Sequence, residues 1–180
     1  MAELFEDMLS GGHPNSLGRT VEVVEIVLAD PPRFEELFLC YRSADPVVRL
    51  RTSNAMKRVE AERHDLLVPY IDRFIAEVGA LDQASAQWTL AQLFARLAAQ
   101  MTAPQRAAAE ALMRRNLERA DDWIVLKTHM DTLAEWAERD AALTDWLCPH
   151  LARLGRDSRK SVASRAGRLA ARLCAGAPVS

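Results

Sequence analysis

Apolar positions recur along this chain with the period of an α-helix, and one stripe of them repeats at a fixed distance. Within residues 46–59 the apolar or small positions lie three and four residues apart, the spacing of one buried helix face. These positions are Val48, Thr52, Ala55, Met56 and Val59. Shifts of 38, 77 and 114 residues give fifteen further positions, of which only His129 and Thr132 are polar. The pattern predicts one such helix in each of four repeats.

An acidic turn precedes each of these helices, and another apolar helix precedes each turn. Asp45 and Pro46 are residue types that favour the N-cap and the first turn of a helix. Thr102 and Gln105 have the spacing of a capping box. The preceding helices are expected at residues 31–43, 64–80, 104–120 and 141–154. Pro149 lacks an N–H, so we expect it to kink or split the last of them.

Two further helices are expected ahead of the repeats, at residues 2–9 and 20–29. The linker between them, residues 10–18, holds three of the seven glycines, so we expect the first helix to be loosely attached. The predicted organisation is therefore an N-terminal helix with its linker, a repeat domain and a short tail. Their bounds are residues 1–19, 20–174 and 175–180.

The composition agrees with an all-α protein. Of 180 residues, 30 are Ala and 23 are Leu, which favours helices, whereas sheet proteins need many more β-branched residues than this chain has. A hydrophobic content of 49% excludes an intrinsically disordered chain.

Several features predict a cytoplasmic protein without a membrane span. The first ten residues are acidic rather than basic, unlike a signal peptide, and no apolar stretch approaches the length of a span. The cysteines are Cys40, Cys148 and Cys174, an odd number without a CxxC pattern. We expect neither a disulfide framework nor a zinc site, and we expect Cys40 and Cys148 to be small core residues.

An Asp-x-x-Val-Arg turn that opens an Ala- and Leu-rich helix every 37–39 residues resembles HEAT repeats. The best copy is Asp45-Pro-Val-Val-Arg49, followed by Ala55-Met56. The chain is similar to short bacterial HEAT-like proteins over residues 20–174. This resemblance implies an all-α, α-α superhelix, a solenoid of about four helix pairs in which the second helices line a concave face. It implies a fold and transfers no catalytic residue.

Polar residues occupy equivalent positions on the second helix of each predicted pair. They are spaced three and four residues apart, so they share one helix face. The candidate binding residues among them are Arg51, Asn54, Arg58, Gln92, Arg96, Asp131, Glu135, Arg165, Arg168 and Arg172. One interpretation is an ordinary solvated face. The other, which is our first hypothesis for the function, is a groove through which a non-enzymatic interaction module binds a protein or peptide.

A DNA-binding or repair protein of the HEAT-like glycosylase type is the alternative, with Asp122 and Trp123 as its candidate residues. The net charge of −2 argues against nucleic acid, because duplex binding needs a basic surface. The four histidines form no HExxH motif, and we expect no metal or cofactor. Residues 1–36 hold eight acids and two bases, whereas residues 149–180 hold one acid and seven bases. This asymmetry is consistent with two polar terminal caps on the repeat array, and the alternative is weak head-to-tail self-association.

Overall fold

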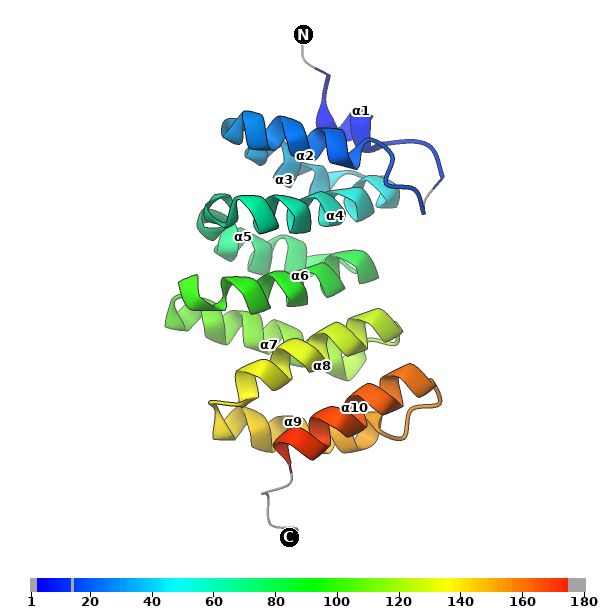
Figure 1. The fold of residues 1–180 in the computed structure, drawn as a ribbon, viewed down its shortest axis with the longest axis vertical. Coiled ribbons are helices and arrows are strands. Elements are labelled where there is room, and N and C mark those ends of the chain that lie inside the picture. The colour runs from blue at the N-terminus through cyan, green and yellow to red at the C-terminus, as the bar shows by residue number, and fades with distance from the viewer. Residues whose placement is uncertain (1–2, 14, 175–180) are drawn as a thin grey trace. The chain divides into compact units, whose positions relative to one another are not determined.

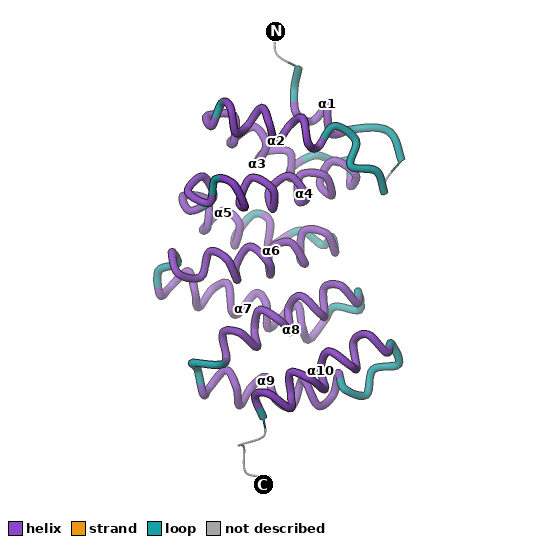
Figure 2. The backbone as a smooth tube through the Cα atoms, viewed as in Figure 1, coloured by secondary structure: helices purple, strands orange, loops and turns teal. Residues whose placement is uncertain are grey.

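The computed structural model describes residues 3–13 and 15–174, and over these residues the chain is helical without any strand (Figures 1 and 2). The predicted all-α class is confirmed. The chain divides into two compact units, Met1–Leu93 and Phe94–Ser180, with the boundary inside helix α6. No described helix is both long and apolar enough to cross a membrane. The predicted tail, residues 175–180, lies outside the described residues.

The first unit contains α1 (Phe5–Leu9), α2 (Thr20–Ala29), α3 (Phe34–Leu39), α4 (Pro46–Glu62), α5 (Ile71–Ala76) and most of α6 (Ala84–Leu97). Short 3-10 turns flank α3 and α5, at Pro31–Arg33, Cys40–Arg42, His64–Leu66, Val68–Tyr70 and Val78–Ala80. The helices predicted at residues 31–43 and 64–80 are therefore each built from several short pieces. Pro69 lies inside the second of these stretches, where it removes a backbone N–H that a continuous helix would use.

Helix α1 is firmly part of the first unit, so the expectation of a loosely attached helix is wrong. Phe5 and Leu9 are fully buried. The guanidinium of Arg33 lies 4.0 Å from the centroid of the Phe5 ring, and the Phe5 N–H donates to the carboxylate of Glu36. Burial of two large apolar side chains outweighs the flexibility that the glycines of the linker suggest.

The second unit contains the end of α6, a 3-10 turn at Ala98–Gln100, α7 (Ala103–Arg119), α8 (Trp123–Ala137), α9 (Ala141–Leu154) and α10 (Lys160–Leu173). Helix α8 packs against α7, α9 and α10, and α9 packs against α10. Helix α9 runs without a break through Pro149, so the predicted split is wrong. Because Pro149 has no N–H, the backbone carbonyl of Asp145 lacks its usual hydrogen bond within the helix. Both residues are exposed, so water can hydrogen-bond to that carbonyl.

Acidic turns begin several helices, as predicted. The Asp45 carboxylate accepts the N–H of Val47, and the Asp122 carboxylate accepts those of Ile124 and Val125. The capping box of Thr102 and Gln105 is also confirmed, with both of its hydrogen bonds present. These side chains satisfy backbone donors that have no partner within the helix.

A disulfide joins Cys148 on α9 to Cys174 at the end of α10, with the two Cα atoms 5.9 Å apart. The expectation of no disulfide is therefore wrong, as is the prediction of Cys148 as a simple core residue. An odd number of cysteines leaves one unpaired but does not prevent the other two from meeting. The one left over is Cys40, which is buried as expected. Because disulfides persist mainly in oxidising compartments, the cysteines no longer argue for a reducing one.

We predict that Cys174→Ser lowers the free energy of unfolding by about 3 kcal/mol. This is the value expected when a disulfide between two cysteines 26 residues apart in the sequence is removed. Urea denaturation of the oxidised protein and of the variant measures this difference. A reducing agent should destabilise the wild type equally and leave the variant unchanged. Three free thiols in the unfolded, unreduced wild type would contradict the prediction.

Candidate functional site

Arg51, the first residue of the predicted groove, faces inward. Only 2% of it is exposed, so the expectation that its guanidinium lines an open groove is wrong. Its hydrogen bonds in the described chain all go to backbone carbonyl oxygens. Nη1 donates to Leu9, Ser10 and Gly11, Nη2 donates to His13, and Nε donates to Ser16, at 2.7–3.1 Å. Arg51 therefore binds the end of α1 to the start of the loop that leads to α2.

Glycine gives the loop room to close on this guanidinium. Gly18 has a φ of +52°, in the left-handed region, and a Cβ there would lie 2.9 Å from Cζ of Arg51. Of the linker glycines that suggested flexibility, Gly18 therefore serves close packing against Arg51.

The other predicted residues of the first unit stay near the surface. The Nε of Arg58 donates to the side chain of Asn54 at 2.8 Å, and Gln92 on α6 is half-buried. Arg58 is exposed and lies beside a pocket, whereas Arg51 on the same helix does not. The predicted polar face of α4 therefore contains one buried residue, Arg51, and one exposed residue, Arg58.

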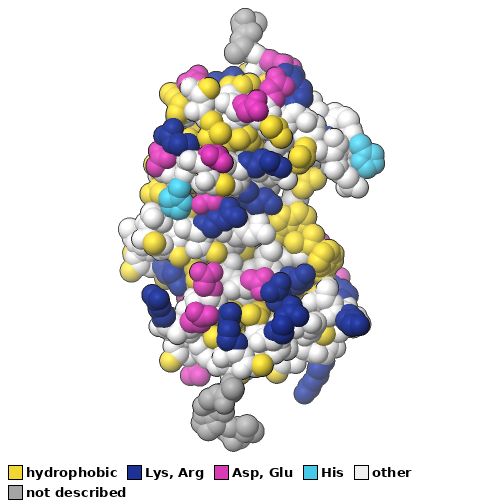
Figure 3. Space-filling model, viewed as in Figure 1, with side chains coloured by type: hydrophobic (Ala, Val, Ile, Leu, Met, Phe, Trp, Pro, Cys, Tyr) yellow, Lys and Arg dark blue, Asp and Glu magenta, His cyan; other side chains and the backbone are white. Residues whose placement is uncertain are grey.

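In the second unit, the predicted residues other than Arg96, which lies on α6, gather on α8 and α10, where acidic and basic side chains lie side by side (Figure 3). Asp131 forms an ion pair with Arg165 at 3.5 Å, and Arg172 forms one with Glu138 at 3.4 Å. Burial raises the pKa of Asp131, and Arg165 opposes this effect. Arg168 donates to Ser164 of its own helix. The remaining predicted residues, Arg96 and Glu135, are exposed.

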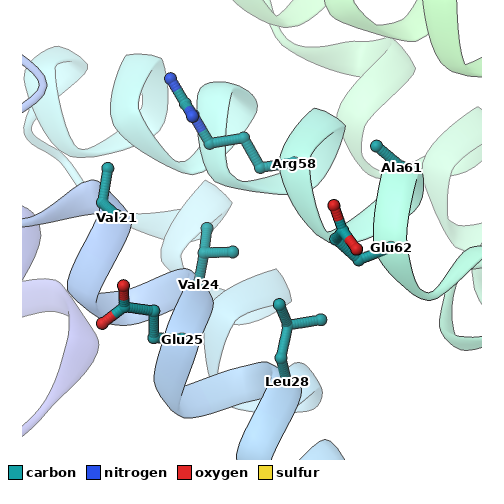
Figure 4. A pocket seen from close by; sticks show the side chains of 7 residues that line it. All are labelled: Val21, Val24, Glu25, Leu28, Arg58, Ala61 and Glu62. Atoms are coloured by element: carbon teal, nitrogen blue, oxygen red, sulfur yellow. The ribbon is translucent and has the colours of Figure 1, made fainter.

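A pocket of about 350 Å³ lies between α2 and α4 of the first unit (Figure 4). Its apolar lining comprises Val21, Val24, Leu28 and Ala61, and its charged lining comprises Glu25, Arg58 and Glu62. Val24 and Leu28 point from α2 toward α4, and Glu62 points back toward α2 (Figure 4). Apolar side chains are exposed between acidic ones over these two helices (Figure 3). This is a concave, partly apolar surface with a charged rim, the form that binding sites commonly take.

Of the pocket residues, only Arg58 is among the predicted binding residues, because α2 precedes the four predicted repeats. The sequence of α2 does carry a signal, because its apolar residues cover more than one face of the helix. Val23 and Val27 of α2 are buried, while Val21 is 44% exposed and Leu28 is partly exposed on a neighbouring stripe. A helix with apolar residues beyond its buried face has more apolar surface than its own fold covers.

His129 lies on the buried stripe of its helix, as the repeat pattern predicts, and only 1% of the residue is exposed. Its Nδ1 lies 2.8 Å from the carbonyl oxygen of Val125, and its Nε2 lies 3.3 Å from Nδ2 of Asn116. A neutral ring with the proton on Nδ1 donates to Val125 and accepts from Asn116. Burial lowers the pKa of His129 to about 4, so the ring is neutral at physiological pH.

The residues of the repair alternative have structural partners. Asp122 caps α8 with its carboxylate, as described above. Trp123 is 46% exposed, and the Nζ atom of Lys127 lies 5.1 Å from the centroid of its ring. This arrangement gives the repair hypothesis no support, because the carboxylate already binds two backbone N–H groups. No group of three metal-ligating side chains is present among residues 3–13 and 15–174.

Comparison with known proteins returned no matching family, no similar curated sequence and no similar solved structure.

We predict that Arg51→Met lowers the free energy of unfolding by about 3 kcal/mol, because five carbonyl groups lose a charged donor. Amide hydrogen exchange should accelerate in residues 9–18. Arg58→Met, on an exposed position of the same helix, is the matched control and should change stability by no more than about 0.5 kcal/mol. Equal effects of the two substitutions would contradict an anchoring role for Arg51.

We predict that His129 makes the protein less stable in acid. Its pKa in the folded state, about 4, lies below its ordinary value of 6.5, so the unfolded chain takes up a proton first as the pH falls. The stabilisation is complete above pH 6.5 and is lost progressively toward pH 4, by about 3 kcal/mol. Chemical denaturation of the wild type and of His129→Gln across this range measures the effect. The prediction fails if both proteins show the same dependence on pH.

Proposed function

We propose that this chain is a non-enzymatic, HEAT-like helical repeat protein that binds a partner protein, and that the pocket between α2 and α4 takes up an apolar segment of that partner. The observation that carries the proposal is the pocket itself. It leaves Val21, 44% exposed, and part of Leu28 uncovered on a helix whose other apolar face is already buried. Apolar surface that its own fold leaves uncovered within a concavity is typical of a site that a partner covers.

The helix arrangement within each unit supports the HEAT-like interpretation. In the second unit, α7 packs with α8 and α9 packs with α10, while α8 also packs with α10 of the next pair. In the first unit, α2 packs with α4. Packing between successive helix pairs buries apolar faces that no single pair covers alone, as in helical repeat proteins.

Model helices provide a direct test of the pocket. We expect a fluorescent peptide of about 16 residues, with Leu at helical spacing and Gln elsewhere, to bind the wild type saturably with one peptide per chain. Ala61→Trp should fill the pocket and weaken binding at least about tenfold, and Leu28→Asp should weaken it similarly by placing a charge on the apolar lining. Fluorescence anisotropy measures the affinity, and circular dichroism checks that both variants remain folded.

The matched control is Ala107→Trp, which adds the same side chain at an exposed position of α7 in the second unit. Its affinity for the peptide should equal that of the wild type. Absence of saturable binding, or equal affinities in all four proteins, would remove the pocket as the binding site.

A further inference from the structure

The pocket between α2 and α4 has the length of about two helical turns. Its lining on α2 runs from Val21 to Leu28, which is roughly 10 Å along the helix axis at 1.5 Å per residue. Its lining on α4 runs from Arg58 to Glu62. A helix laid against two neighbouring helices presents apolar side chains three, four and seven residues apart, which matches this length. A strand would need an exposed sheet edge, and the described residues form no sheet.

Two carboxylates beside the apolar lining have no cationic partner. Neither Glu25 nor Glu62 forms an ion pair or a side-chain hydrogen bond within the part of the chain that the structure describes. Other acids of the same unit are paired, for example Glu22 with Arg19 at 2.8 Å and Glu36 with Arg33 at 2.6 Å. The pocket lining therefore carries two negative charges that no ion pair among the described residues neutralises.

Arg58, the cation of the pocket, does not neutralise this charge. Its guanidinium is hydrogen-bonded to Asn54 and points away from the carboxylates of Glu25 and Glu62 (Figure 4). Two unpaired anions therefore border the apolar lining, and the one cation that the pocket lining contains is turned away from them.

The whole first unit carries the same sign of charge. Residues 1–93 contain 15 acidic and 9 basic side chains, whereas residues 94–180 contain 10 acidic and 14 basic ones. A negative field around the pocket raises the encounter rate of a cationic segment and disfavours an acidic one.

We infer that the segment bound between α2 and α4 is a basic amphipathic helix of a partner protein. Its apolar side chains contact Val21, Val24 and Leu28, and Lys or Arg side chains beside them pair with Glu25 and Glu62. This inference rests on the proposed function and adds the charge of the partner to it.

Three peptides that share the Leu positions and carry Lys, Gln or Glu at the others test the inference at low ionic strength. We expect the Lys peptide to bind at least about tenfold more tightly than the Gln peptide, and the Glu peptide to bind most weakly. In Glu25→Gln/Glu62→Gln, which keeps the side-chain shapes, the preference for Lys over Gln should fall to less than about threefold. Added salt should reduce the preference in the wild type.

A control variant separates local pairing from the overall charge. Asp7→Asn/Asp72→Asn changes the net charge by the same amount at two exposed positions on α1 and α5, outside the pocket lining. It should keep the full preference for the Lys peptide. An equal loss of preference in both double variants would overturn the inference, because only the overall charge would then matter.

The failures of the two proposals are distinguishable. Equal binding of the Gln and Lys peptides to the wild type would overturn the inference and leave the pocket as a binding site for apolar helices. Binding of the Lys peptide that Ala61→Trp does not weaken would overturn both, since the peptide would then lie elsewhere. Failure of all three peptides to bind would also overturn both.

Discussion

The first unit depends on one buried cation, the guanidinium of Arg51. A charge at 2% exposure is costly unless its donors are satisfied, and five carbonyl groups of the segment from Leu9 to Ser16 satisfy them. The cost of burying the charge thereby fixes the end of α1 and residues 10–13, which are exposed. The fully buried side chains of Phe5 and Leu9 add to this attachment.

The position of the pocket follows from the same anchor. The segment that Arg51 holds leads directly into α2, whose first residue, Thr20, donates to the carbonyl of Leu17. Helix α4 supplies both Arg51, which places the start of α2, and Arg58 and Glu62, which line the pocket against α2. One helix therefore sets the orientation of α2 and forms the opposite wall. Loss of the anchor should affect the pocket as well as the loop.

Periodicity and local signals predicted most of the helices, because both act over a few residues. The helices at residues 20–29 and 141–154 have the bounds that the pattern indicated, and the caps at Asp45 and Thr102 are present. The contacts that were missed join residues far apart in the chain. Arg51 reaches a segment about forty residues earlier, and Cys148 meets Cys174 across a turn between two helices. No helical period encodes such meetings, so the sequence pattern could not reveal them.

Aligned polar positions are weak evidence for a binding surface, for a physical reason. On α8 and α10, Asp131 pairs with Arg165 and Glu138 pairs with Arg172, so much of this charge is satisfied between neighbouring helices. Such exposed pairs contribute about 0–1 kcal/mol each and leave little attraction for a partner. At the α2/α4 pocket, unpaired carboxylates lie beside uncovered apolar surface, so the proposed partner would gain both apolar burial and ion pairing there. We therefore place the proposed binding surface where charge and apolar area are both left without partners, rather than where polar residues align.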